Sequence, residues 1–162
     1  MVVLAGLMSV CPAFAEEPIV GRASVVDGDT MEIAGERIRL HGVDAPESWQ
    51  LCEDGDGFRY RCGREAAMML DRFLAASRPT RCEFVERDRY QRFVGTCFRA
   101  DGVEVNRWLV EGGLAVDWAR YSDGAYADAQ GEARAQALGM WRGPFQLPCE
   151  ARVQRSNQLP SC

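Results

Sequence analysis

Hydrophobic and polar residues alternate along two stretches of the chain, a pattern that is typical of β-strands with one buried face. The first stretch predicts three consecutive strands, over residues 19–26, 30–33 and 37–43. The polar segment Ala34-Gly35-Glu36 forms a short turn between the last two of them. The second stretch predicts a hairpin, with strands over 80–87 and 93–99.

Three further segments have helical features. Apolar residues three and four positions apart predict a helix over 63–76, and a short helix over 104–111 ends at two glycines. A third helix is expected over 123–138, with Asp123 as its N-cap. This order of elements predicts an α+β fold with a small barrel or curled sheet, followed by a C-terminal tail from about residue 143.

A chain of 162 residues fits one domain with a real core. Residues 1–15 carry no charge, and Ala13-Phe14-Ala15 has the small-x-small form of a signal-peptidase site. This apolar run is shorter than the ~20 residues of a membrane span. Cys11 offers a lipoprotein alternative, which Val10 before it disfavours. We therefore expect a cleaved signal peptide over 1–15, a single domain over 16–162, and a periplasmic or secreted protein.

The cysteines agree with export. The chain has seven, and without Cys11 an even number is left, which predicts disulfide bonds in a secreted protein. The six are Cys52, Cys62, Cys82, Cys97, Cys149 and Cys162. Cys82 and Cys97 are symmetric about the centre of the second hairpin and should face each other. Cys52–Cys62 would close a small loop, and Cys149–Cys162 would fix the tail. Zinc binding is the alternative, but the chain has no C-x-x-C pair and one histidine.

The net charge of −5 argues at first against a nucleic-acid partner, which usually requires a basic face. A bound divalent cation would offset part of this charge, and an enzyme that releases its product needs little affinity. All 19 basic residues are arginine, which binds phosphate in a bidentate manner. General arginine bias explains most of them, but Arg87, Arg89 and Arg92 cluster in one turn.

Three carboxylates and one arginine lie close together in the first hairpin. The hairpin brings Asp29, before one strand, near Asp44, after the next, and Arg39 and Glu47 flank that second strand end. Two acidic groups at one place repel each other unless a cation lies between them. Oxygen ligands without His or Cys favour Ca²⁺ or Mg²⁺, and a neighbouring arginine suits phosphate. The pattern indicates a metal-assisted phosphodiesterase.

These motifs resemble the staphylococcal-nuclease-like (thermonuclease) family. Its V-D-G-D-T strand end matches 26–30, and its R-x-x-x-x-D-x-P-E pattern matches 39–47. Its D-x-Y-G-R turn is similar to 88–92, with Gln91 in place of the usual glycine. Weaker matches are 106–110, 113–115 and 139–141. The resemblance extends from about residue 20 to 141, and it implies a five-stranded OB-type β-barrel with three helices.

The resemblance also implies roles for individual residues. Metal ligands would be Asp29, Asp44 and the backbone carbonyl of Ala45, and the metal would be Ca²⁺. Glu47 would act as the general base, while Arg39 and Arg92 would stabilise the charge that grows on the phosphate. Tyr90 and Tyr121 would line the nucleotide pocket.

The sequence therefore predicts an exported Ca²⁺-dependent nuclease that hydrolyses DNA, and RNA as well, with little sequence specificity. We expect a monomer with no membrane span and no obligate protein partner. Two alternatives remain open. One is an OB-type module of the cell envelope that binds nucleic acid without cutting it. The other is a disulfide-stabilised envelope protein that binds calcium only for stability.

Overall fold

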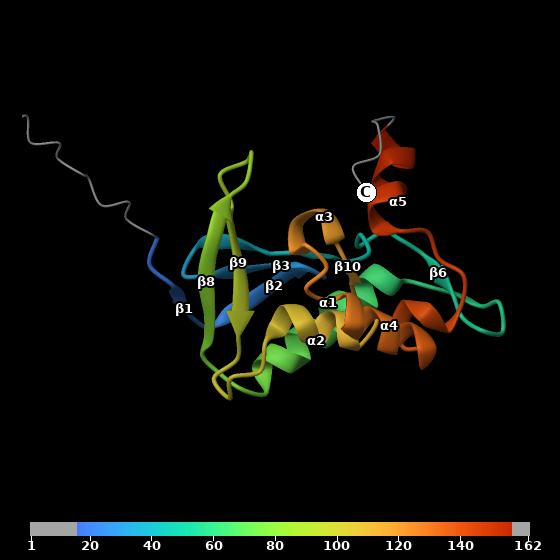
Figure 1. The fold of residues 1–162 in the computed structure, drawn as a ribbon, viewed down its shortest axis with the longest axis horizontal. Helices are drawn as coiled ribbons and strands as arrows, with labels where there is room; N and C mark the ends of the chain where they lie inside the picture. The colour runs from blue at the N-terminus through green and yellow to red at the C-terminus, as the bar shows by residue number, and fades with distance from the viewer. Residues whose placement is uncertain (1–15, 157–162) are drawn as a thin grey trace, which may run out of the picture.

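The computed structural model describes residues 16–156, and its centre is a mixed sheet with the strand order β1-β8-β9-β4-β3-β2 (Figure 1). All neighbours pair antiparallel except β4 and β9, which run parallel. The strands are β1 (Ile19–Gly21), β2 (Ala23–Asp27), β3 (Thr30–Ile33), β4 (Glu36–Leu40), β8 (Thr80–Arg87) and β9 (Phe93–Phe98).

The sheet curls because its two edge strands are joined by a single residue. β1 pairs with β8 at one edge and β2 pairs with β3 at the other, yet only Arg22 lies between β1 and β2. The predicted strand over 19–26 is therefore one bent strand that takes part in both edges. Counted this way the sheet has five strands, and the expected α+β fold with an OB-type barrel is confirmed.

The first hairpin forms as predicted. Ala34 and Gly35 both have positive φ, 53° and 83°, which gives the two-residue turn that suits the twist of a hairpin. The strand expected over 37–43 is interrupted, because Gly42 has φ 72° and redirects the chain. The segment beyond it forms β5 (Val43–Asp44), which pairs with β10 (Val116–Asp117). The sequence analysis did not predict β10, nor the small hairpin of β6 (Cys52–Glu53) and β7 (Arg59–Tyr60).

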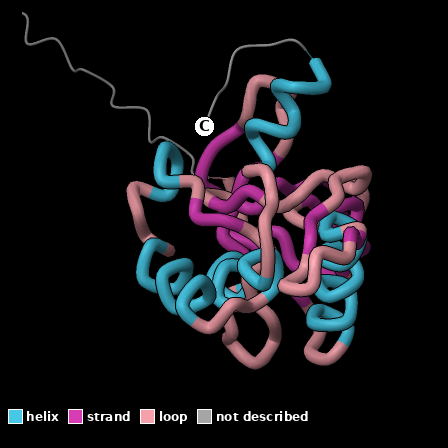
Figure 2. Tube along the Cα trace, turned by 90° about the vertical axis from the view of Figure 1, so that its right-hand side faces the viewer, coloured by secondary structure: helices cyan, strands magenta, loops and turns pink. Residues whose placement is uncertain are grey.

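Three helices cover the sheet on one side (Figures 1 and 2). They are α1 (Cys62–Ala75), α2 (Val105–Glu111) and α4 (Ala127–Ala135). Most of the predicted apolar face of α1 is buried, with Ala66, Leu70 and Leu74 at most 3% exposed, whereas Met69 at its edge is 38% exposed. These side chains join Met31, Ile33 and the other inward-facing strand residues in one core.

The prediction of one continuous helix over 123–138 is wrong. The segment instead contains α3 (Ala119–Ser122), a break, and then α4. Asp123 is the C-cap of α3 with φ 53°, and Gly124 follows with φ 78°. Both residues are left-handed, so no α-helix can run through them, and Asp123 does not act as an N-cap.

The segment from residue 143, expected to be a tail, contains a further helix, α5 (Pro148–Ser156), after the 3₁₀ turn η1 (Gly139–Arg142). Within residues 16–156 there are thus five α-helices where three were expected. Among these residues no helix is long and apolar enough to cross a membrane.

Two of the predicted disulfide bonds are confirmed. Cys82 and Cys97 face each other on β8 and β9 and are bonded, and Cys52 is bonded to Cys62. The proposed partner of Cys149, Cys162, lies outside the described residues, as does the expected signal peptide.

Candidate active site

The two aspartates of the predicted metal site lie side by side beneath the surface. Asp29 is 3% exposed and Asp44 is 1% exposed. Gly28 allows this arrangement, since a Cβ atom at that position would lie 2.7 Å from the Cβ of Ala45. The turn before β3 can therefore pack directly on the strand end after β5.

The Arg39 guanidinium bridges these carboxylates. Its Nη1 donates to Oδ1 of Asp29 at 2.6 Å, and its Nη2 donates to Oδ1 of Asp44 at 3.3 Å. The amide of Ala45 donates to the other oxygen of Asp29 at 2.9 Å. Burial raises the pKa of Asp29 to about 7, although the charge of Arg39 acts in the opposite direction. The pair of buried acids is thus held by cationic and backbone donors.

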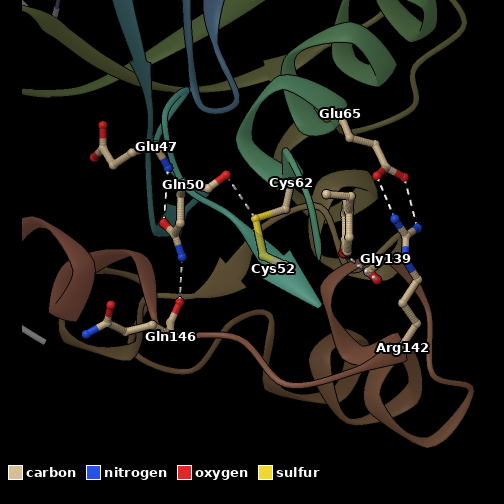
Figure 3. The surroundings of a disulfide bond; sticks show 9 residues. Glu47, Gln50, Cys52, Cys62, Glu65, Gly139, Arg142 and Gln146 are labelled. Atoms are coloured by element: carbon tan, nitrogen blue, oxygen red, sulfur yellow. Dashed lines mark hydrogen bonds and ion pairs between the residues drawn. A yellow bond between two sulfur atoms is a disulfide. The ribbon is translucent and has the colours of Figure 1, made fainter. Parts of the chain in front are cut away.

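Contacts of its backbone carbonyl and amide fix the position of Glu47. Its carbonyl oxygen packs on the start of α1, where a Cβ on Gly63 would come within 1.9 Å of it, so only glycine fits there. The side chain of Gln50 accepts a hydrogen bond from the Glu47 amide at 3.3 Å and donates to the carbonyl of Gln146 at 2.6 Å (Figure 3). The disulfide between Cys52 and Cys62 lies next to this link in the same view. The loop after Glu47 is therefore fixed on both sides.

Arg92 belongs to the turn between β8 and β9. Its Nε donates to Oδ2 of Asp88 at 2.6 Å, and its amide donates to Oδ1 of Asp88 at 2.9 Å. Gln91 takes a left-handed conformation, with φ 63°, so the turn keeps the shape that glycine would allow. The side chain of Asp88, which the sequence analysis did not single out, holds Arg92 in place.

A cleft of about 380 Å³ brings the predicted residues together. Arg39, Glu47, Arg92, Tyr90 and Tyr121 all line it. Asp29 and Asp44 are buried and do not line it, but both pair with Arg39, which does. Trp118 also lines the cleft, and its ring packs edge-on against Tyr121 with centroids 4.6 Å apart. Tyr90 is 71% exposed and Tyr121 39%, so both rings are accessible for stacking.

One residue of the site was missed entirely. Arg152 of α5 donates from Nη1 and Nη2 to the two oxygens of Asp44, at 2.8 and 3.0 Å. Its Nη1 also donates to Glu47 at 3.0 Å. The pairing joins residues more than a hundred positions apart, and the sequence of α5 is polar on average. The sequence feature that could have drawn attention to Arg152 is its place near a cysteine, in a segment expected to be a tail.

Carboxylate oxygens are the type of ligand that a hard divalent cation prefers, but the carboxylates here are not arranged as a preformed metal site. Within residues 16–156 no group of three or more His, Cys, Asp or Glu side chains is arranged to hold a metal. Yet Asp29, Asp44 and Glu47 converge on guanidinium groups, which shows that this place attracts positive charge. Oxygen donors of this type suit Ca²⁺, with water completing the shell.

Comparison with known proteins agrees with this geometry. The family model described as staphylococcal nuclease homologue matches residues 37–143, which include β4, β8, β9 and the turn of Arg92.

Three relatives illustrate the range of named activities. The succinoglycan biosynthesis protein ExoI of Rhizobium meliloti (strain 1021) is 60% identical over 160 residues, which cover 99% of this chain and 84% of that protein. An uncharacterized endonuclease of Escherichia coli O157:H7 is 33% identical over 129 residues, 76% of this chain and 77% of the relative. The micrococcal nuclease of Shigella flexneri is 30% identical over 137 residues, 74% and 71% of the two chains.

Proposed function

Since this chain belongs to the staphylococcal nuclease family, we propose that it is an exported, Ca²⁺-dependent nuclease that hydrolyses phosphodiester bonds of DNA and RNA with little sequence specificity. The observation that carries the proposal is the convergence of Arg39, Arg92 and Glu47 on one cleft above two buried aspartates.

The arginines would bind the scissile phosphate. Arg39 of β4 and Arg92 of the turn between β8 and β9 both line the cleft, so a phosphate between them could accept hydrogen bonds from both guanidinium groups. They would also stabilise the negative charge that grows on the phosphate oxygens during attack. Glu47, about 30% exposed at the cleft, is the residue proposed to orient a water molecule and take its proton.

Asp29, Asp44 and the carbonyl of Ala45 are the proposed ligands of the cation. When bound, Ca²⁺ would act as a Lewis acid on the phosphate. The exposed rings of Tyr90 and Tyr121 would hold the adjoining bases by stacking, which tolerates any sequence.

Export is part of the proposal. The disulfide bonds between Cys52 and Cys62 and between Cys82 and Cys97 support it, since such bonds persist in oxidising compartments. A periplasmic or extracellular enzyme would meet Ca²⁺ and foreign nucleic acid there.

Degradation of single-stranded DNA and RNA by the oxidised protein tests the activity. We expect hydrolysis with Ca²⁺, none with chelator, and a loss of about 10²–10³-fold in rate for Glu47→Gln. Binding without cleavage, unchanged by this substitution, would favour the OB-type binding module. Melting that depends on Ca²⁺ without any affinity for nucleic acid would favour calcium as a purely structural ion.

The relative in Rhizobium meliloti supplies a second candidate, because its name assigns it to succinoglycan biosynthesis. We propose that this chain too contributes to exopolysaccharide production. Deletion of its gene should lower the exopolysaccharide yield. Complementation with Glu47→Gln then separates the two proposals, since a restored yield would show a role independent of the nuclease site.

A further inference from the structure

The helix that the sequence analysis missed places a third arginine in the acidic site. Arg152 forms a bidentate ion pair with Asp44, and the same guanidinium also contacts Glu47. Asp44 is 1% exposed, so this arginine takes the place that water would otherwise occupy around its carboxylate. Bidentate pairs of arginine with carboxylates are among the strongest polar contacts in proteins.

The remaining contacts of α5 hold mainly its beginning. The link from Gln50 to the carbonyl of Gln146 fixes the chain just before the helix (Figure 3), and Pro148, Cys149 and Ala151 are buried. Among the described residues, the ion pairs and ring contacts of its second half with the rest of the protein are those of Arg152, whose guanidinium also lies 5.5 Å from the ring centroid of Trp118, and a stacking of Arg155 over Trp49 at 4.6 Å. The helix stands apart from the layer of α1, α2 and α4 (Figure 1). Its position over the cleft thus depends strongly on Arg152.

Arg152 pairs with the oxygen atoms of Asp44 that a metal would need. It occupies both oxygens of Asp44 and one oxygen of Glu47. When Asp29 is ionised, three carboxylates face two guanidinium groups, so the cluster keeps one negative charge. A divalent cation in place of Arg152 would neutralise it, whereas the cation and Arg152 together would leave it positive and crowded.

We propose that Arg152 is a built-in competitor of the divalent cation, so that docking of α5 and metal binding at Asp44 exclude each other. This inference rests on the proposed function, because it assigns a regulation to the proposed metal site. Docked α5 fills the site with a guanidinium and narrows the cleft with Val153 and Ser156. Since coupling between two ligands of one site is reciprocal, Ca²⁺ must in turn release the end of α5.

Calorimetric titration of the full oxidised chain with Ca²⁺ tests the competition. We expect Arg152→Ala to bind Ca²⁺ about tenfold to a hundredfold more tightly than the wild type. Arg155→Ala is the matched control, because it removes the same charge from the same helix without touching a carboxylate. It should stay within about threefold of the wild type, since its contact with Trp49 is a partly exposed cation–π pair. Equal or weaker binding by Arg152→Ala would overturn the proposal.

Hydrogen exchange of residues 148–156 provides a second readout, which a general charge effect would not change. In the wild type, Ca²⁺ should accelerate exchange in the last turn of α5, and in Arg152→Ala the exchange should be fast without Ca²⁺. Unchanged or slower exchange on Ca²⁺ addition would contradict the competition.

The nuclease assay separates this proposal from the proposed function. If hydrolysis requires Ca²⁺ but Arg152→Ala has the affinity of the wild type, the competition is wrong and the nuclease stands. If neither protein binds Ca²⁺ and neither cuts nucleic acid, the proposed function fails and the regulation fails with it.

Discussion

Replacement of Asn106 should reveal how the strand that leads to the site is held. Asn106 is fully buried at the start of α2. Its Oδ1 accepts a hydrogen bond from the amide of Cys97 at 3.0 Å, and its Nδ2 donates to the carbonyl oxygens of His41 at 2.9 Å and Gly95 at 3.3 Å. One side chain thus joins β9 to the turn between β4 and β5, three residues before Asp44.

The magnitude follows from the groups that would lose their partner. In Asn106→Leu, which keeps the number and branching of the side-chain heavy atoms, the amide of Cys97 and the carbonyl of His41 are left unpaired. The carbonyl of Gly95 keeps the amide of His41, at 2.9 Å. Each buried unpaired group costs about 1–3 kcal/mol, and the added apolar burial offsets part of the sum. We expect the free energy of unfolding to fall by about 2–4 kcal/mol.

Urea unfolding followed by tryptophan fluorescence measures this change, with the free energy taken by linear extrapolation. Arg107→Ala is the control on the adjacent position, since Arg107 is half-exposed and pairs with Asp128 at the surface at 3.2 Å. Such a surface pair contributes about 0–1 kcal/mol. A loss below 1 kcal/mol for Asn106→Leu, or equal losses for both variants, would refute the argument.

Two further predictions concern the disulfide bond of the second hairpin and the aromatic ring of Tyr121 in the cleft. The bond between Cys82 and Cys97 closes a loop with a sequence separation of 15, so the double replacement by alanine should lower the free energy of unfolding by about 3 kcal/mol. Urea unfolding measures it, and the reasoning fails if the double variant is as stable as the oxidised wild type. Tyr121→Ala, made in the inactive Glu47→Gln background, should weaken binding of single-stranded DNA by about 1–3 kcal/mol in a fluorescence titration. Tyr121→Phe should bind as before, because stacking does not use the hydroxyl; equal loss in both would exclude stacking.

The parts of the fold that the sequence predicted are those determined by local pattern. β3 and β8 begin and end where alternation begins and ends, and the face of α1 follows its apolar period. The pairing of Cys82 with Cys97 followed from the symmetry of a hairpin, which depends only on the position of its turn. Such features need no knowledge of distant parts of the chain.

The errors lie where a single residue changes the direction of the backbone. The helix expected over 123–138 fails at Asp123 and Gly124, although Asp-Gly is a common turn sequence and could have been interpreted so. Gly42 divides the strand expected over 37–43 in the same way. Composition and hydrophobic period are averages over several residues, so they do not reveal a single residue with a left-handed backbone conformation.

α5 was missed for another reason. Its sequence is polar, and the side chain that docks it is an arginine whose partners Asp44 and Glu47 lie over a hundred residues earlier. The local spacing of residues does not reveal a long-range ion pair, because it does not distinguish one arginine of the tail from another as the partner of these carboxylates. The candidate site could thus be predicted as a set of acids and arginines, but not the way in which they are paired.

This pairing bears on how an acidic chain can bind a polyanion. At the cleft, Arg39 and Arg152 are both engaged by carboxylates, so a phosphate that approaches must compete with Asp29, Asp44 and Glu47 for them. A divalent cation on Asp29 and Asp44 would free the Arg39 guanidinium for the substrate and would release Arg152 together with the end of α5. Under the proposed function, the cation therefore removes the net negative charge of this cluster as well as polarising the phosphate. By linkage, nucleic acid and Ca²⁺ should then each tighten the binding of the other. The net charge of −5 is no obstacle to binding in such a cleft, because it describes the whole chain and not the site once the cation is bound.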